Sequence, residues 1–199
     1  MNAIDKNMFD TMTNEKYYDD YEDSVGQEVK EANKKLVERF PFLIPRNAWS
    51  GKKITEGAGF WPGSPDEVPE YDYEYTLLDD MPEGWRKAFG EQMCQELKDA
   101  LERSSDGMDD DVGDWYPIQI KEKYGSLQFY PIWSTEEIDK VIFKYEKLSL
   151  ETCIKCGAPA TKYTIGWISP YCDKCVPKYD AVITREEYFG ENLRNSNIF

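Results

Sequence analysis

The chain has 199 residues, of which 40% are hydrophobic and 15% aromatic, and its formal charge at neutral pH is −15. This length suits one domain of ordinary size plus a small appendage, and the aromatic content favours a folded chain over an acidic disordered one. The chain contains no histidine. That absence excludes Ser-His-Asp and Cys-His catalytic sites, His-Glu-x-x-His metalloproteases, histidine-containing zinc deaminases and nucleases with a histidine base.

The negative charge is unevenly distributed. Residues 1–150 hold 18 basic and 33 acidic side chains, a net charge of −15, whereas residues 151–199 hold 6 of each and are neutral. An acidic field repels phosphate backbones and favours basic partners. The acidity of the first part therefore indicates either simple solubility or an acidic, aromatic-rich interaction surface.

Two absences bear on location. The apolar runs are only a few residues long, so we expect no transmembrane helix and no membrane partner. The first ten residues, MNAIDKNMFD, lack the basic and then apolar segments of a signal peptide. We therefore expect a cytoplasmic protein.

The first third of the chain changes from polar to amphipathic to irregular. Residues 1–23 are polar and acidic, and we expect a flexible N-terminal arm. Ser24 and Gln27 match a capping box, and the apolar spacing that follows predicts a helix over residues 25–39. Residues 42–80 lack periodicity and are expected to wrap irregularly around the body. The expected aromatic anchors of this segment are Trp49, Phe60 and Trp61.

Three further elements complete the body. Apolar residues at helical spacing predict a second helix over residues 80–103. After a loop with five aspartates, alternating runs over 115–121 and 126–133 predict a β-hairpin with residues 122–125 between them. A second capping-box pattern, starting at Ser134, predicts a third helix.

These elements predict an α+β protein with three parts: a flexible acidic N-terminal arm (1–23), an acidic α+β body (24–150) and a zinc-binding module with a C-terminal tail (151–199). A lone hairpin is not stable in water, so it must pack on the helices. The expected fold is a small helix-and-hairpin body followed by a treble-clef or zinc-ribbon module.

The module is predicted from four cysteines. Cys153 and Cys156 form one Cys-x-x-Cys pair, Cys172 and Cys175 form another, and fifteen residues separate the pairs. This spacing is typical of a four-thiolate zinc site, because zinc prefers tetrahedral coordination by soft sulfur ligands. Four thiolates leave no open position, so the zinc is expected to be structural. The fifth cysteine, Cys94, is interpreted as a small buried apolar residue.

Other interpretations of the four cysteines are two disulfides, which are uncommon in the cytosol, or a redox Cys-x-x-Cys, which normally occurs singly. Within the zinc interpretation two folds are considered, and the treble clef is preferred over the zinc ribbon. A treble clef would place the second pair at the start of a helix, for which Pro177 suits the first turn. A zinc ribbon would place the two pairs on two hairpins.

The segments IKEKYGSLQFY, TCIKCGAPAT and GWISPYC, together with DDMPEGWRKAFG upstream, are distinctive as a set. They resemble a group of uncharacterised proteins found in bacteriophages, prophages and bacterial genomes, over roughly residues 78–175. The resemblance implies a phage or mobile-element setting and a zinc site at the four cysteines. It implies no mechanism.

The leading functional hypothesis is a non-enzymatic, zinc-containing interaction protein that acts through an acidic, aromatic-rich surface on a protein partner. The resemblance also singles out residues of the hairpin, and the possible interaction surface is Lys121, Lys123, Tyr124 and Trp167. The alternative for these residues is ordinary hairpin chemistry with lysines on the solvated face.

Two alternative functions stay open. A nucleic-acid-binding zinc module would use basic and aromatic side chains in the range 151–199. The overall negative charge of the chain disfavours this function. The candidate residues are Lys155, Lys162, Lys174, Lys178, Tyr163, Trp167 and Tyr171. A nuclease that uses carboxylates and a divalent ion would place acidic side chains beside Lys121 and Lys123. Its candidate ligands are Asp109, Asp110, Asp111 and Asp114, although Gln119 stands where such a site needs an acidic residue.

Overall fold

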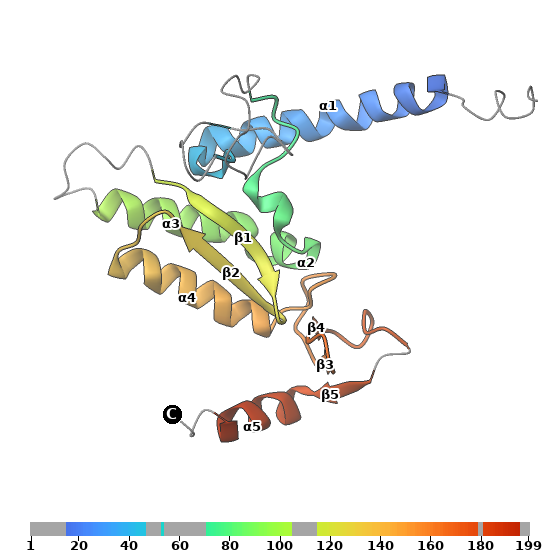
Figure 1. The fold of residues 1–199 in the computed structure, drawn as a ribbon, viewed down its shortest axis with the longest axis vertical. Helices are drawn as coiled ribbons and strands as arrows, with labels where there is room; N and C mark the ends of the chain where they lie inside the picture. Colours follow the sequence, from blue (N-terminus) through green and yellow to red (C-terminus); the bar gives the residue numbers. More distant parts are fainter. Residues whose placement is uncertain (1–14, 47–52, 54–70, 105–114, 179–180, 196–199) are drawn as a thin grey trace, which may run out of the picture.

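The computed structural model describes residues 15–46, 53, 71–104, 115–178 and 181–195 (Figure 1). The helices are α1 (Glu15–Arg39), α2 (Glu83–Trp85), α3 (Glu91–Ser104), α4 (Glu136–Leu150) and α5 (Arg185–Asn195). The strands are β1 (Pro117–Lys123), β2 (Ser126–Pro131), β3 (Lys162–Thr164), β4 (Pro170–Tyr171) and β5 (Val182–Thr184). Helices and antiparallel strands together confirm the predicted α+β class.

α1 is longer than the sequence pattern predicted. It begins at Glu15, so residues 15–23 of the predicted flexible arm are helical, and Ser24 lies inside the helix instead of capping it. Residues 1–14 lie outside the described residues. The extension has a simple cause: once the amphipathic part has nucleated, each further residue adds a hydrogen bond without the cost of a new nucleus.

After α1 the chain turns into the core. Phe40 is fully buried, and the 3₁₀ turn η2 (Pro41–Leu43) places Phe42 against the edge of the Trp115 ring, with 5.2 Å between centroids. Of the predicted irregular segment, the described parts form an Arg46–Lys53 bridge and a second 3₁₀ turn, η3 (Leu77–Asp80). The predicted anchors Trp49, Phe60 and Trp61 lie outside the described residues.

The predicted second helix is confirmed, with one irregularity. It begins at Glu83, immediately after Pro82, and a π-helical turn (Arg86–Gly90) joins α2 to α3. The predicted apolar stripe is buried along its whole length. Its members are Trp85, Phe89, Met93, Leu97, Ala100 and Leu101.

The predicted hairpin is also confirmed, but its turn is tighter than expected. β1 runs on to Lys123, so only Tyr124 and Gly125 form the turn, with φ angles of 54° and 79°. Two positive φ angles are the mark of a type I′ turn, whose twist matches the strands. Side chains alternate between a buried face and an outward face. The outward face consists of Gln119, Lys121, Lys123, Ser126, Gln128 and Tyr130.

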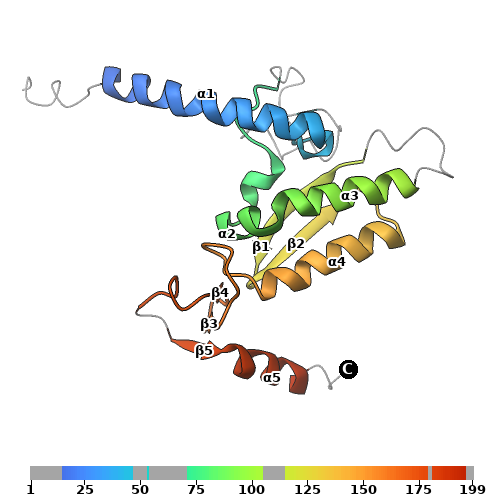
Figure 2. The ribbon, with the colours of Figure 1, turned by 180° about the vertical axis from the view of Figure 1, so that it is seen from behind.

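The buried face of the hairpin packs on α3 and α4. α3 and α4 lie side by side, and the hairpin lies in front of them in Figure 1 and behind them in Figure 2. Ile120, Leu127 and Phe129 point into this core with the stripe of α3 and with Ile138 and Tyr145 of α4. The free edge of β2 is closed by α4, because the buried N–H of Leu127 donates to Ser149 Oγ at 2.8 Å.

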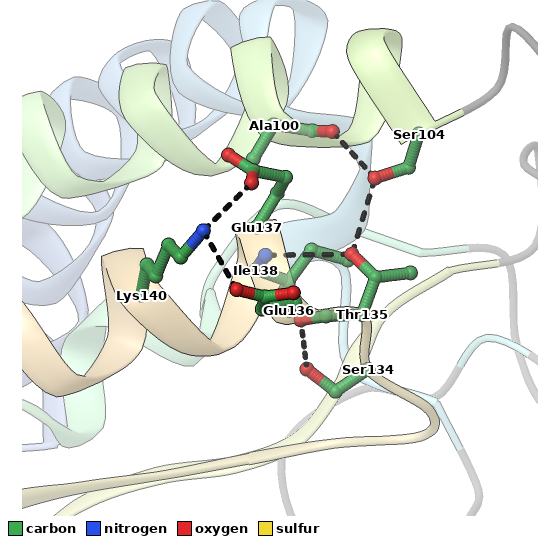
Figure 3. A network of polar contacts seen from close by, with 8 residues as sticks. All are labelled: Ala100, Ser104, Ser134, Thr135, Glu136, Glu137, Ile138 and Lys140. Atoms are coloured by element: carbon green, nitrogen blue, oxygen red, sulfur yellow. Dashed lines mark hydrogen bonds and ion pairs between the residues drawn. The ribbon is translucent and has the colours of Figure 1, made fainter.

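α4 begins one residue later than its capping pattern indicated. The N-cap is Thr135, whose hydroxyl accepts from the Ile138 N–H at 3.4 Å, and Ser134 stands outside the helix (Figure 3). The Thr135 hydroxyl also lies 3.1 Å from Ser104 Oγ, which donates to the Ala100 carbonyl. This chain of contacts ties the start of α4 to the end of α3.

The C-terminal residues form a three-stranded sheet with the order β4-β3-β5, and all neighbouring strands are antiparallel. α5 follows β5 directly, and its Tyr188 stacks on Tyr163 of β3 with 4.3 Å between ring centroids. The expected helix start at Pro177 is wrong, since this residue lies in an irregular segment after the second cysteine pair.

Candidate metal centre

The four predicted ligands lie together in the structure. Cys153 and Cys156 lie in a tight turn after α4, in which the Gly157 N–H donates to the Cys153 carbonyl at 3.0 Å. Gly157 has a φ of 81°, a conformation that glycine adopts without strain. Cys172 and Cys175 form an equivalent turn after β4, closed by the Cys175 N–H on the Cys172 carbonyl at 3.0 Å.

Backbone hydrogen bonds bring the two turns together. The N–H of Ile154, inside the first turn, donates to the carbonyl of Pro170, two residues before the second pair, at 2.9 Å. The N–H of Thr161 donates to the carbonyl of Tyr171 at 2.8 Å. The cysteines are therefore placed by the backbone of β4 and its neighbours rather than by their own side chains.

The sulfur positions fit a tetrahedral ion. The four Sγ atoms all lie within 4.8 Å of one another, and those of Cys156 and Cys172 are 3.6 Å apart. Four sulfurs at 2.3 Å from one zinc ion would be separated by about 3.8 Å. All four cysteines are free, so the disulfide interpretation is not what the structure shows. Among the described residues, this is the one cluster of three or more potential ligand side chains close enough to share an ion.

The electrostatics of the cluster favour loss of a proton from Cys172. Burial alone would raise the pKa of the thiol, but hydrogen bonds from the Lys174 backbone and from Cys156 and Cys175 outweigh burial and lower that pKa to about 7. The neighbouring thiols Cys156 and Cys172 instead raise the pKa of Cys175 to about 12. The four thiols are therefore hydrogen-bonded to one another. A metal ion binds the thiolate form of cysteine, so binding of the ion would release these protons.

The first cysteine turn is fused to the body through glycines. The N–H of Gly84, at the start of α2, donates to the Ile154 carbonyl at 3.0 Å, and the indole N–H of the buried Trp85 donates to the Thr152 carbonyl at 2.9 Å. A Cβ atom on Gly84 would lie 2.3 Å from the Cys153 carbonyl oxygen. The sequence pattern did not identify Gly84 as part of this junction. The only indication in the sequence is that a glycine occupies the first turn of a helix.

The predicted interaction residues are partly brought together. Tyr124, at the tip of the hairpin, lies beside Trp167, in the loop between β3 and β4, with 6.2 Å between ring centroids. Lys123 lies over the Tyr124 ring at 5.4 Å, whereas Lys121 lies over Tyr130 at 5.7 Å. The turn touches the same loop, because a Cβ on Gly125 would lie 2.8 Å from the carbonyl oxygen of Ile168.

Tyr163, one of the aromatic residues predicted for a nucleic-acid-binding surface, does not lie on the surface. Tyr163 is fully buried, and its hydroxyl donates to the Leu150 carbonyl at 2.8 Å. Burial raises the pKa of this phenol to about 12. A base cannot stack on this ring, so the predicted basic and aromatic face of the module loses one of its three aromatic residues.

The remaining predicted side chains are the aspartates of the nuclease alternative and the fifth cysteine. The candidate nuclease carboxylates Asp109, Asp110, Asp111 and Asp114 lie outside the described residues. Cys94 is fully buried in α3, as expected for a small apolar residue, and burial raises the pKa of its thiol far above the ordinary value.

In the described part of the chain, none of the helices is long and apolar enough to cross a membrane. Comparison of the chain with protein-family models, with curated proteins and with solved structures gave no match.

Proposed function

We propose that the protein is a non-enzymatic, zinc-containing interaction protein of phage or mobile-element type. The donor set supports zinc as the ion, because four sulfurs at tetrahedral spacing suit zinc, with iron as the competing metal. With all four positions filled by thiolates, the ion has no place for a substrate or a reactive water. Its role is to hold the two cysteine turns together.

The arrangement of the strands supports the zinc-ribbon alternative over the treble clef. The first cysteine turn is flanked by a bridge between Thr152 and Pro159, and the second follows β4 of a three-stranded sheet. The described residues after Cys175 lead to β5 before α5 begins at Arg185. The second pair is therefore not the start of a helix, which a treble clef requires.

The observation that carries the interaction function is the exposed pair Tyr124 and Trp167. These side chains are 64% and 65% exposed although their rings lie side by side. Tryptophan and tyrosine dominate binding energy at protein interfaces, and an aromatic cluster in water is costly unless something covers it. Two segments far apart in the sequence present this pair.

Tyr124 adds a second argument. A left-handed φ of 54° is ordinary for Asn or Gly in a type I′ turn, but a bulky aromatic residue there costs about 1 kcal/mol or more. The exposed ring contributes little to the core, so stability alone does not account for a tyrosine at this position. The sequence-based hypothesis named both an acidic, aromatic-rich surface and the residues Lys121, Lys123, Tyr124 and Trp167. The exposed pair, which lies beside Lys123, supports the second of these.

Metal analysis and affinity capture test this proposal. Elemental analysis should find one zinc, and little iron, per chain. Tagged wild-type protein should recover a specific protein from the cells that carry the gene, and the Tyr124→Ala/Trp167→Ala double variant should lose it. Phe143→Ala is the matched control, because Phe143 is 59% exposed on α4 and should be dispensable. Equal recovery by all three proteins, or by none, would count against the function.

A further inference from the structure

The exposed aromatic pair continues into the outward face of the hairpin. Trp167 contacts Tyr124, Tyr124 lies under the ammonium group of Lys123, and Lys121 lies over Tyr130 on the same face. We call these five residues the lysine–aromatic strip. In Figure 1 the outward face is turned away from α3 and α4, and no described element lies in front of it.

The strip is held in place by the backbone beneath it. The buried hydroxyl of Thr164 donates to the Trp167 carbonyl at 2.6 Å and accepts from the Ser169 N–H at 2.9 Å, which closes the loop that carries Trp167. The packing of Gly125 on Ile168 fixes this loop against the hairpin tip. A surface ordered before binding loses little conformational entropy when a partner docks.

The charge of the strip is opposite to that of the chain. The outward positions of the hairpin hold two lysines, and the remaining residues there (Gln119, Ser126, Gln128 and Tyr130) are uncharged at neutral pH. The nearest carboxylate in β1, that of Glu122, accepts from the Gly125 N–H at 2.7 Å. A protein with a net charge of −15 thus presents a locally positive face.

We propose that the lysine–aromatic strip binds an extended acidic segment of a partner protein. An apolar side chain of the segment would cover Tyr124 and Trp167, and its carboxylates would lie over Lys121 and Lys123. From Lys121 to Tyr124 the strand advances about 10 Å, so a segment of about six to eight extended residues covers the strip. This inference rests on the proposed function and adds the chemistry of the partner.

Charge decides between this partner and a single-stranded nucleic acid. Both have groups that suit lysines and aromatic rings. Nucleic acid, however, carries a charge at every nucleotide, and two lysines neutralise only a small part of it against the repulsion of a chain at −15. A protein segment places a few carboxylates at the strip alone, and therefore meets less long-range repulsion.

Selection from a display library of random twelve-residue peptides tests the proposal on the zinc-loaded, 199-residue chain. Selected peptides should be enriched in Asp and Glu around one aromatic or aliphatic residue. In fluorescence anisotropy titrations of a selected peptide, Trp167→Ala should weaken binding by about thirtyfold, the effect of losing a hot-spot residue. Lys121→Glu/Lys123→Glu should weaken it to a similar extent and should reduce its dependence on salt.

The matched control is a cation–π pair on another surface. Lys147 lies 5.1 Å over the ring of Phe143 on α4. The double variant Lys147→Glu/Phe143→Ala therefore reverses a lysine charge and removes an aromatic ring, the two kinds of change made in the strip variants. It should leave the peptide affinity unchanged. Circular dichroism and zinc content confirm that each variant is folded, and Trp167→Phe should restore most of the binding.

Three results of the selection would overturn the inference: no peptides are selected, the selected peptides have no acidic bias, or their affinity is unaffected by the strip variants. Binding of a twenty-nucleotide oligothymidine to the strip more tightly than the selected peptides would also overturn it. The capture experiment separates these failures. If it still finds a partner that needs Tyr124 and Trp167, only the acidic nature of the partner is wrong. If it finds none, the interaction function itself fails.

Discussion

Gly84 and Gly157 meet backbone to backbone where the body joins the first cysteine turn. A Cβ atom on Gly157 would lie 2.7 Å from the Gly84 carbonyl oxygen, and one on Gly84 would lie 2.7 Å from the Cys156 nitrogen. Side chains at either position would separate the two segments. The cysteine cluster is thus built directly onto the start of α2, and the indole N–H of Trp85 reinforces the junction by donating to the Thr152 carbonyl.

Gly84→Ala should therefore destabilise the whole protein. The added methyl group would collide with backbone atoms, which cannot move aside as a flexible side chain does, so we expect a loss of about 3 kcal/mol in the free energy of unfolding. Urea denaturation measures this change. Gly26→Ala is the control, because nothing lies within 4 Å of a Cβ at that helical position, and it should be neutral or slightly stabilising. Equal effects of the two substitutions would contradict the close packing at Gly84.

Serine substitution of any one of the four clustered cysteines should abolish stoichiometric zinc binding and cooperative unfolding. A structural zinc site contributes roughly 10–16 kcal/mol of apparent binding free energy, comparable to the whole stability of a domain. Zinc content and thermal unfolding, with and without a chelator, measure the effect. Cys94→Ala should retain zinc, since Cys94 is buried in α3 away from the cluster. Retention of zinc by two or more of the serine variants would exclude a four-thiolate site.

Ser149→Ala tests the hydrogen bond that closes the edge of β2. Without the hydroxyl, the buried N–H of Leu127 has no acceptor, at a cost of about 1–3 kcal/mol. Ser134→Ala, at an exposed position before α4, should change stability by about 0.5 kcal/mol or less. Chemical denaturation of both variants gives the comparison, and a neutral Ser149→Ala would show that the strand edge has another partner.

Tyr124→Asn should separate stability from binding. Asparagine adopts the left-handed conformation with less strain, so the hairpin should gain about 0.5–1 kcal/mol after loss of the Trp167 contact. The same change removes an aromatic ring from the strip and should reduce partner recovery. Denaturant unfolding and affinity capture give the two results. A variant that is both more stable and fully active would show that the tyrosine ring has no part in binding.

The ion pair between Glu96 and Lys144 makes stability depend on pH. Partial burial alone would raise the pKa of Glu96, but hydrogen bonds from Lys144, at 2.6 and 2.7 Å, and from Gln92 outweigh it and lower this pKa. A lowered folded-state pKa means that the carboxylate stabilises the fold above its unfolded pKa and that this contribution disappears as the pH falls through the folded value.

The stability difference between wild type and Glu96→Gln should accordingly be constant near neutral pH and shrink below about pH 4. The Glu96 side chain is 30% exposed, so the difference should be about 1 kcal/mol or less and should decrease in high salt. Urea titrations from pH 7 to pH 3 measure it. A difference that grows in acid would reverse the assigned sign.

Features that depend on neighbours along the chain could be predicted from the sequence. The stripe from Trp85 to Leu101, the alternation around Leu127 and Phe129, and the spacing of the two cysteine pairs are repeats of a few residues, and such repeats follow from the geometry of helices, strands and turns. The errors at the element boundaries were also local. α1 starts at Glu15 instead of residue 25, α4 is capped by Thr135 instead of Ser134, and the hairpin turn at Tyr124 is shorter than predicted.

Contacts between distant segments have no such periodicity, and only the tertiary structure decided them. Nothing near Gly84 in the chain indicates that Gly157, in the first cysteine turn, leaves no room for a side chain there. The sequence likewise gives Tyr163 and Trp167 equal standing as surface aromatics, although β3 and α5 bury the first and a loop closed by Thr164 exposes the second. The spacing of the cysteine pairs by itself predicted the four-thiol cluster, which could hold a metal ion. The packing of the hairpin tip on that module determined that Tyr124 and Trp167 remain exposed side by side.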